Sequence, residues 1–173
     1  MLLRLALLVR HTPPYRPLDA LLSYVHVTLQ NSLFATHARA QFAGRAGVRR
    51  LATASPLCMG LLTLHHPAWH PAHPGVKHMA MRACAACRDA GWEGGLPALA
   101  TGFAFARAGE EGMPVVVGLS SPREVHECVR AWRVVREGKD VEKRVALEKE
   151  VVGMFGGMQG WMWESPDPEA LKD

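Results

Sequence analysis

Two turns of small residues contain the side chains of this sequence that could bind a ligand. The first is the run ASPLCMGLLT at residues 54–63, which follows a strand-like run, VRRLAT. Pro56 cannot donate a hydrogen bond to a strand ladder and holds its own φ near one value, so we expect the strand to stop at Ser55. A turn with a defined shape therefore follows this strand.

The second turn lies in the run PVVVGLSSPREVHE at residues 114–127. Its apolar part is broken by Gly118 and then by the Ser-Ser-Pro run at residues 120–122, and an acidic stretch compatible with a helix follows. From the residues alone, both turns have two interpretations. They are either strand exits that cap helices or the turns of a nucleotide site.

A third group of residues could ligate a metal ion. Cys84 and Cys87 are spaced to share one face of a helix, and several histidines lie nearby in the sequence, namely His65, His66, His70, His73 and His78. Their spacing matches no standard zinc pattern. The alanine-rich run MRACAACRDA instead favours cysteine as a small core residue, so we expect no metal.

The composition indicates one globular domain. The chain has 173 residues, a net charge of +4 and a mean hydropathy of −0.01. Lys and Arg are interleaved with Glu, and no basic stripe studded with aromatic residues is present, so we expect no nucleic-acid partner. Four cysteines without a regular framework are typical of a reducing compartment, and we expect a cytoplasmic protein.

The amino-terminal run MLLRLALLV is apolar but predicts neither a signal sequence nor a membrane span. Arg4 interrupts it, no small-residue cleavage site follows, and the run is too short to cross a bilayer. Leu2, Leu5 and Val9 fall on one face at helical spacing, which predicts an amphipathic helix packed on a core. We therefore expect no membrane partner.

The rest of the chain alternates strands with helices. We expect strands at about 18–27, 49–53 and 115–117. We expect helices at about 33–44, 76–90, 96–108 and 122–136, and a last one from about residue 140. This alternation is typical of an α/β fold in which helices cover a parallel sheet.

Three parallel strands do not make a complete sheet. A parallel strand needs both faces covered, and an open sheet leaves two edges with free backbone groups. A closed barrel of βα units takes about 250 residues. Because this chain is shorter, its pattern predicts a fragment of a larger fold.

Several segments resemble the carboxy-terminal half of the aldo/keto reductase family, and most of all its branch of NAD-dependent D-arabinose and L-galactose dehydrogenases. They are RHTPPYRPLDALLSYVHVTLQNS, ASPLCMGLLT, PAWHPAHPGVK, VVVGLSSPREVHE and WMWESP, which together span nearly the full chain. The resemblance implies a partial (β/α)8 TIM barrel, roughly the last three strands with their helices. It also implies that residues 1–173 are the carboxy-terminal portion of an aldo/keto reductase domain, with the amino-terminal half missing.

The resemblance further implies which residues contact a nicotinamide cofactor. In the family, the turn after strand seven lies along the pyrophosphate and the turn after strand eight holds the adenosine end. The implied cofactor-binding residues are Ser55, Leu57 and Gly60 for the first turn, and Gly118, Leu119, Ser120, Ser121, Glu124, Glu127 and Cys128 for the second. Small residues and free backbone groups at the first turn let a phosphate come close.

NAD is the implied cofactor, and NADP is disfavoured. Where NADP-preferring members have a basic residue for the 2′-phosphate, this sequence has Glu124, which would repel that group and accept a bond from a ribose hydroxyl. Arg123 beside it opposes this preference. The family's usual pair near the adenine, an acidic residue followed by Asn, is Glu127-Cys128 here.

No catalytic residue is implied within the chain. The family uses a tyrosine, a lysine, an aspartate and a histidine of its amino-terminal half, and neither Tyr15 nor Tyr24 lies in a matching motif. Tyr24 is expected in the core or in a pocket wall. The aromatic residue that stacks on the nicotinamide is replaced by Ala54. Trp161 and Trp163 are expected to cap the barrel or to line a substrate mouth.

Three hypotheses for the function follow. In the first, the chain derives from an NAD-dependent enzyme that oxidises a small-molecule sugar, an aldose of the D-arabinose or L-galactose type, to its lactone. In the second, it is a truncated product without activity. In the third, it is a folded, non-catalytic half-barrel that associates, with itself or with another chain, through its exposed sheet edges.

Overall fold

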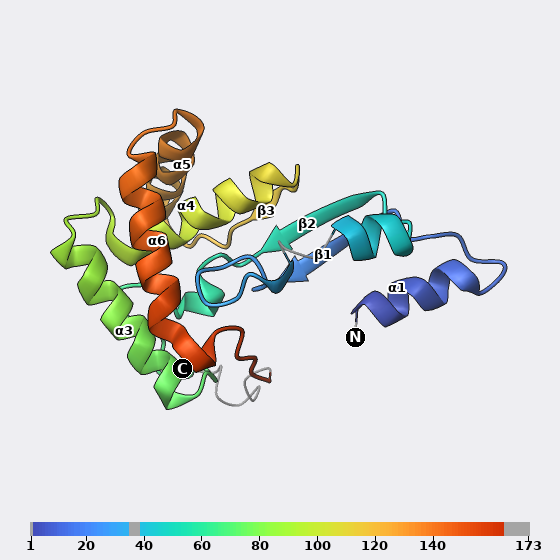
Figure 1. Cartoon of the computed structure of the whole chain (residues 1–173), viewed down its shortest axis with the longest axis horizontal. Coiled ribbons are helices and arrows are strands. Elements are labelled where there is room, and N and C mark those ends of the chain that lie inside the picture. Colours follow the sequence, from blue (N-terminus) through green and yellow to red (C-terminus); the bar gives the residue numbers. More distant parts are fainter. Residues whose placement is uncertain (1, 35–38, 165–173) are drawn as a thin grey trace.

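A parallel sheet of three strands lies at the centre of the fold (Figure 1). Its strands are β1 (Ala20–Tyr24), β2 (Arg50–Ala54) and β3 (Val115–Val116), in the order β1-β2-β3. The computed structural model describes residues 2–34 and 39–164. The predicted α/β class and the parallel sheet are confirmed. The strands are compatible with part of a βα barrel, although the described residues do not form a closed one.

The strands end where the backbone leaves the extended region. Val25 has a φ of 57° and Ser55 has a φ of 60°, values that residues with a side chain adopt rarely. β1 therefore stops at Tyr24 rather than near residue 27. β2 stops immediately before Ser55, as the proline-containing turn predicts.

Most helices lie close to their predicted positions. They are α1 (Leu2–His11), α3 (Pro74–Asp89), α4 (Gly95–Glu110), α5 (Pro122–Arg136) and α6 (Val141–Phe155), with short 3₁₀ turns η2 (Cys58–Gly60) and η3 (Gly156–Met158). The helix expected at 33–44 differs, because Arg39–Arg45 form a π-helix, η1, and residues 35–38 lie outside the described part of the chain. Across the described residues, no helix has the length and apolar character that a bilayer crossing requires.

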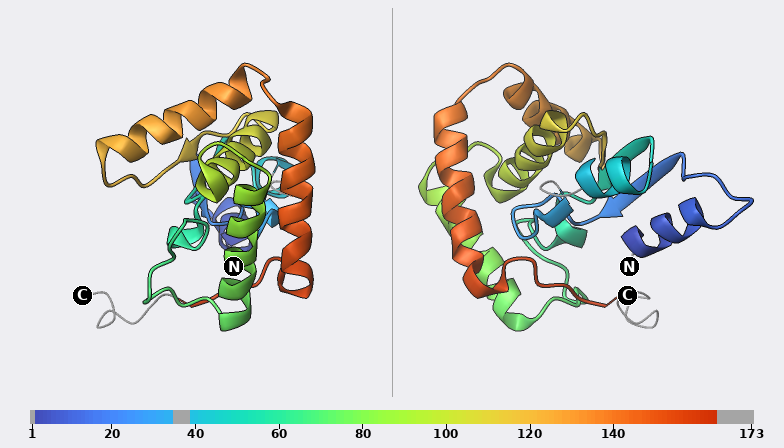
Figure 2. Two further views of the ribbon diagram at one scale, coloured as in Figure 1. Left: turned by 90° about the vertical axis from the view of Figure 1, so that its left-hand side faces the viewer. Right: turned by 45° about the vertical axis from the view of Figure 1, so that its right-hand side comes forward.

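Two hydrophobic clusters hold these elements together. The larger one joins α3, α4 and α6 and contains the fully buried Val76 and Val151. The smaller one covers one face of the sheet and contains Ala6 of α1 together with Leu21 and Leu51. Figures 1 and 2 show α3, α4 and α6 grouped at one end of the molecule and α1 at the other. The sheet therefore connects two separately packed ends.

Helix α1 packs through a different face from the one predicted. Ala6 is buried, whereas Leu2 and Leu5, which the spacing placed on the packed face, are 41% and 49% exposed. The prediction was wrong because this helix carries leucines on several of its faces, so their spacing alone does not select the packed face. The packed face is the one that carries Arg10, whose Nη1 donates to the carbonyl oxygen of Arg45 at 2.5 Å.

One face of the sheet is covered and the other is open. Leu21 and Leu51 point to the covered face, and the alternation of side chains along a strand places Leu22, Tyr24 and Val116 on the other, where they are 47%, 49% and 50% exposed. Tyr24 is therefore at the surface and not in the core. β1 and β3 are each paired on one side only within the described residues, so two strand edges are open as well.

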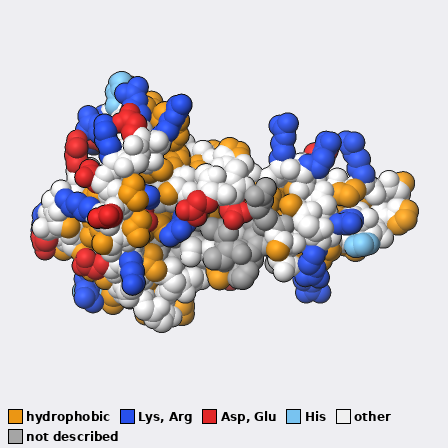
Figure 3. All heavy atoms as spheres, turned by 45° about the horizontal axis from the view of Figure 1, so that its top comes forward, with side chains coloured by type: hydrophobic (Ala, Val, Ile, Leu, Met, Phe, Trp, Pro, Cys, Tyr) orange, Lys and Arg blue, Asp and Glu red, His pale blue; other side chains and the backbone are white. Residues whose placement is uncertain are grey.

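Charge is unevenly distributed along the molecule. In Figure 3, Lys and Arg side chains predominate at the end that carries α1, whereas both signs are mixed over the helical end. Asp19 lies near the basic end and its carboxylate pairs with Arg16 and Arg49. The basic residues are therefore less evenly mixed with acids than the sequence pattern indicated.

An ion pair within α6 is buried against the helical core. Arg144 Nη1 lies 2.6 Å from Glu148 Oε1, and the two side chains are 9% and 5% exposed. Burial raises the pKa of the Glu148 carboxyl, and the neighbouring Arg144 acts in the opposite direction. The guanidinium Nε of Arg144 has no hydrogen-bond partner in the described residues. The bond from Nη1 to Glu148 therefore supplies the compensation for this buried charge.

We expect Glu148→Ala to lower the free energy of unfolding by about 3–5 kcal/mol, because it leaves Arg144 buried without a counter-charge. Urea denaturation at neutral pH measures the effect. The matched control is Glu93→Ala, which breaks the exposed Arg130–Glu93 pair (66% and 82% exposed) and should cost less than about 1 kcal/mol. Equal losses in the two variants would contradict a structural role for the buried pair.

Candidate functional site

The sheet brings the two predicted turns together. β2 and β3 are neighbours, and the backbone N–H of Ser55 donates to the carbonyl oxygen of Val116 at 3.0 Å. This bond continues the ladder past the end of β2. The turn at 55–60 and the turn at 117–121 therefore both begin at the carboxyl ends of their strands, on the same side of the sheet. The carboxyl ends of parallel strands are where α/β folds generally bind ligands.

The first turn has a strained backbone that its own hydrogen bonds hold. Ser55, Cys58 and Met59 have φ values of 60°, 51° and 58°. The Ser55 hydroxyl accepts the N–H of Met59 at 3.1 Å, and the Ser55 carbonyl accepts the N–H of Cys58 at 3.0 Å. Strained non-glycine residues persist where the surroundings over-determine them, and they concentrate at functional sites.

Gly60 and Leu57 have structural roles in this turn. Gly60 has a φ of 92°, and a Cβ added there would lie 2.9 Å from Cδ of Pro67. The carbonyl of Leu57 accepts the N–H groups of Gly60 and Leu62, and its side chain packs against the larger core. Contact with Pro67 and the turn geometry therefore require the glycine independently of any ligand.

The second turn is more open. A Cβ added at Gly118 would have no atom within 4 Å, and Leu119 is 38% exposed. The backbone N–H of Ser120 donates to the Glu124 carboxylate at 2.6 Å, and Ser121 caps α5 by accepting the N–H of Glu124 at 3.3 Å. Ser121 and Glu124 have the spacing of a capping box, although Glu124 reaches back to Ser120 instead of to the capping residue.

The Glu124 carboxylate is an anion at the start of α5. The N–H and hydroxyl of Ser120 donate to it and hold its pKa below the ordinary value. The positive end of the helix dipole acts in the same direction. Glu124 thus occupies a position where the start of a helix would otherwise favour a phosphate.

The last two predicted residues lie further along α5. Glu127 Oε1 is 3.7 Å from Nε of Arg123, so the arginine expected to oppose the NAD preference has an acidic neighbour on its own helix. Cys128 is half-buried, and burial raises the pKa of its thiol. The structure therefore starts both turns at the carboxyl ends of neighbouring strands, where Ser55 bonds to Val116, and it places Glu124, Glu127 and Cys128 along α5.

Sequence reasoning missed the segment 156–163, which folds back onto the loop after β1. Gln30, 1% exposed, donates its side-chain amide to the carbonyls of Met158 at 3.2 Å and Trp161 at 3.0 Å, and its own carbonyl accepts the N–H of Gly160 at 2.8 Å. A buried glutamine after a strand needs such partners, and the polar pair Gln30-Asn31 was the available signal.

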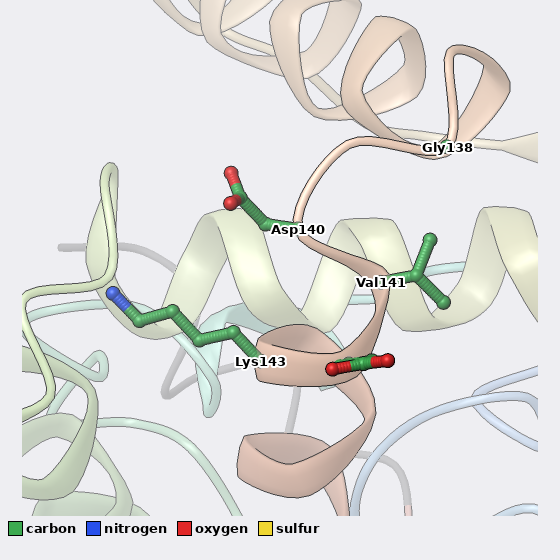
Figure 4. A pocket seen from close by; sticks show the side chains of 5 residues that line it. Gly138, Asp140, Val141 and Lys143 are labelled. Atoms are coloured by element: carbon green, nitrogen blue, oxygen red, sulfur yellow. The ribbon is translucent and has the colours of Figure 1, made fainter.

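Two hollows in the surface lie apart from the predicted turns. One is lined by Asp19, Ala20, Arg49 and Arg50 at the amino ends of β1 and β2. The other precedes α6, where Asp140 and Lys143 extend to one side and Val141 to the other (Figure 4). Neither hollow is lined by a residue of the two turns.

The cysteines and histidines of the third predicted group belong to the core and its loops. Cys87 is fully buried, which raises the pKa of its thiol to about 12, and Cys84 Sγ donates to the carbonyl of Thr63 at 3.3 Å. Within residues 2–34 and 39–164, no group of three or more His, Cys, Asp or Glu side chains could hold a metal ion.

The depressed pKa of Glu124 predicts a pH-dependent contribution to stability. A carboxyl whose pKa is lower in the folded state stabilises the fold at pH values above its unfolded pKa of 4.5. This contribution is lost as the pH falls through the pKa of the folded state. We expect Glu124→Gln to lower the melting temperature at pH 7 and to have a smaller effect at pH 3. Glu127→Gln is the control, and an equal pH profile for the two variants would disprove the capping role.

No protein-family model matches the chain. A curated relative is "L-galactose dehydrogenase" of Arabidopsis thaliana, which is 35% identical over 119 residues. The match covers 68% of this chain and 35% of that protein, so the chain spans about a third of the length of the relative. The similarity indicates a relationship of the aldo/keto reductase type for the matched part of the chain.

Proposed function

We propose that residues 54–63 and 117–128 are part of the nucleotide site of a nicotinamide-dependent oxidoreductase. The observation that carries this proposal is the Ser55–Val116 hydrogen bond, which starts both turns at the carboxyl ends of neighbouring strands. The relative is a dehydrogenase by name, and it belongs to a nicotinamide-dependent oxidoreductase family.

Each turn has a distinct part in this proposal. The strained turn at Ser55 lies along the pyrophosphate, and the open turn at Gly118 contacts the adenosine end, where the absence of a side chain lets the ligand approach the backbone. The Glu124 carboxylate accepts a bond from a free ribose hydroxyl and repels a 2′-phosphate. NAD is therefore the proposed cofactor in preference to NADP.

The proposed reaction is the oxidation of an aldose, of the D-arabinose or L-galactose type, to its lactone. A bound nicotinamide supplies the hydride acceptor for such a reaction. The chain contributes recognition of the nucleotide, since no segment matches the family's catalytic tyrosine, lysine, aspartate and histidine. The setting we infer is the reducing cytoplasm, in agreement with the free thiols of Cys58, Cys84, Cys87 and Cys128.

A thermal-shift titration with NAD and NADP tests the proposal, because a ligand that binds only the folded state raises its apparent stability. We expect a saturable shift that is larger with NAD. Gly118→Val should weaken NAD binding by about tenfold or more, which corresponds to about 1.4 kcal/mol, without lowering stability, since the added side chain points into open space.

Gly153→Val on α6 is the matched control, since a Cβ there also has no atom within 4 Å. It should leave nucleotide binding unchanged. An absent shift with either nucleotide, or equal weakening by the two substitutions, would remove the support for a site at these turns.

A second candidate function is a non-catalytic half-barrel that associates with a second copy. The observations that favour it are the open sheet face with Leu22, Tyr24 and Val116, and the free edges of β1 and β3. In a parallel sheet the free edge of β3 in one copy can accept β1 of another in the same direction. Two such pairings in a symmetric dimer would cover both strand edges of each copy.

Sedimentation of the purified chain tests this association. We expect a defined dimer for the wild-type chain and a monomer for Leu22→Lys, which places a charge on the open sheet face. Leu64→Lys is the matched control, because Leu64 is 64% exposed in the loop after η2, near Gly95 at the start of α4, and this variant should remain dimeric. A monomeric wild-type chain would exclude the second candidate.

A further inference from the structure

His70 lies at a junction that the proposed nucleotide contacts do not use. It belongs to the loop between η2 and α3 and is 2% exposed. Its Nδ1 accepts the backbone N–H of Ala72 at 3.1 Å, and its Nε2 lies 2.8 Å from the carbonyl oxygen of Cys58. Because Nδ1 accepts a hydrogen bond, the hydrogen of the neutral imidazole is on Nε2 and is donated to the carbonyl oxygen of Cys58.

The imidazole also contacts two indole rings. The ring centroid of Trp69 lies 6.0 Å away in a stacked arrangement, and that of Trp163 lies 5.0 Å away in a T-shaped arrangement. The indole N–H of Trp163 points to Sδ of Met59 at 3.5 Å. The His70 side chain therefore contacts both the strained turn, through Cys58, and the segment 156–163, through Trp163.

The surroundings of His70 oppose its protonation. Burial has the largest effect and lowers the pKa of the imidazole, and the charges of Lys77 on α3 and His66 in the same loop act in the same direction. The Cys58 thiol next to the turn stays neutral, because burial raises its pKa to about 12. His73, at the start of α3, accepts the N–H of Gly75 and packs on Trp161.

We propose that His70 is a positioning residue: its neutral imidazole locks the turn at Ser55–Gly60 and residues 156–163 in place, and protonation releases both. A proton on Nδ1 would turn the acceptor for Ala72 into a second donor that faces an N–H group. The stacked face of Trp69 attracts a cation but cannot accept this hydrogen in the direction of Ala72.

The pH dependence has a defined sign. A histidine whose pKa is lowered in the folded state stabilises that state above the unfolded value of 6.5 and loses this contribution as the pH falls from 6.5 through the folded value. The release therefore occurs below pH 6.5. The effect on nucleotide binding rests on the proposed function, whereas the lock itself does not.

Hydrogen–deuterium exchange of the full chain between pH 7.5 and pH 5 tests the lock, after correction for the intrinsic pH dependence of exchange. We expect residues 55–63 and 156–163 to lose protection together, by about tenfold or more, while α4 keeps its protection. Loss of protection in α4 in step with these segments, or no change in either segment, would overturn the proposal.

Two substitutions separate the bonds of the imidazole. His70→Asn offers an oxygen near the position of Nδ1 and can keep the bond from Ala72. His70→Gln offers an amide N–H near the position of Nε2 and can keep the bond to Cys58. Neither side chain titrates, so the pH dependence of exchange should disappear in both variants. The Gln variant keeps the bond to Cys58, so its turn should be better protected from exchange than the turn of the Asn variant.

His26→Asn is the matched control, because burial also lowers the pKa of His26, which lies in the loop after β1. This variant should keep the wild-type pH dependence, and a loss there would assign the switch to His26. NAD titrations at pH 7.5 and pH 5.5 are run in parallel. If NAD fails to bind at either pH, the proposed function fails, while the exchange data still decide the lock.

Discussion

The parallel pairing of β2 with β3 is the constraint on which the candidate site depends. β3 has two residues, and the bonds from Thr53 to Pro114 and from Ser55 to Val116 hold it against β2. So short a ladder needs support from outside the sheet. α4 packs against β3, and the buried Met113 fixes the connection by donating its N–H to the carbonyl of Ala108 at the end of that helix. The position of the second turn therefore depends on the helical core as well as on the sheet.

The first turn is held in a different way, by local contacts that oppose its own strain. Ser55, Cys58 and Met59 of this turn have positive φ values, and each such value would cost about 1–3 kcal/mol in isolation. The Ser55 hydroxyl, the His70 imidazole and the Pro67 ring each restrict the backbone there. Because these contacts come from one stretch of chain, the shape of this turn is largely independent of the rest of the sheet.

Local signals in the sequence were sufficient for much of the fold. The strand and helix alternation follows from periodicity, and the Ser121 cap follows from the spacing of Ser121 and Glu124. Local signals failed where distant contacts decide. The packed face of α1, the role of Gly60 against Pro67 and the return of residues 156–163 to Gln30 each depend on a partner far away or on side-chain shape. The role predicted for Glu124 at a cofactor stays a prediction, and its bonds to Ser120 are local.

The same distinction separates the two turns from the open surfaces of this chain. The hydrogen bonds that shape the two turns lie within residues 55–72 and 120–124, together with the ladder between β2 and β3. The unsatisfied surfaces lie elsewhere, on the open sheet face and on the free edges of β1 and β3. A partner that covered those surfaces would change the burial of Leu22 and Val116, yet it would not need to rebuild either turn. The shapes of the two turns therefore depend on the described fold, and the open face remains available to a partner.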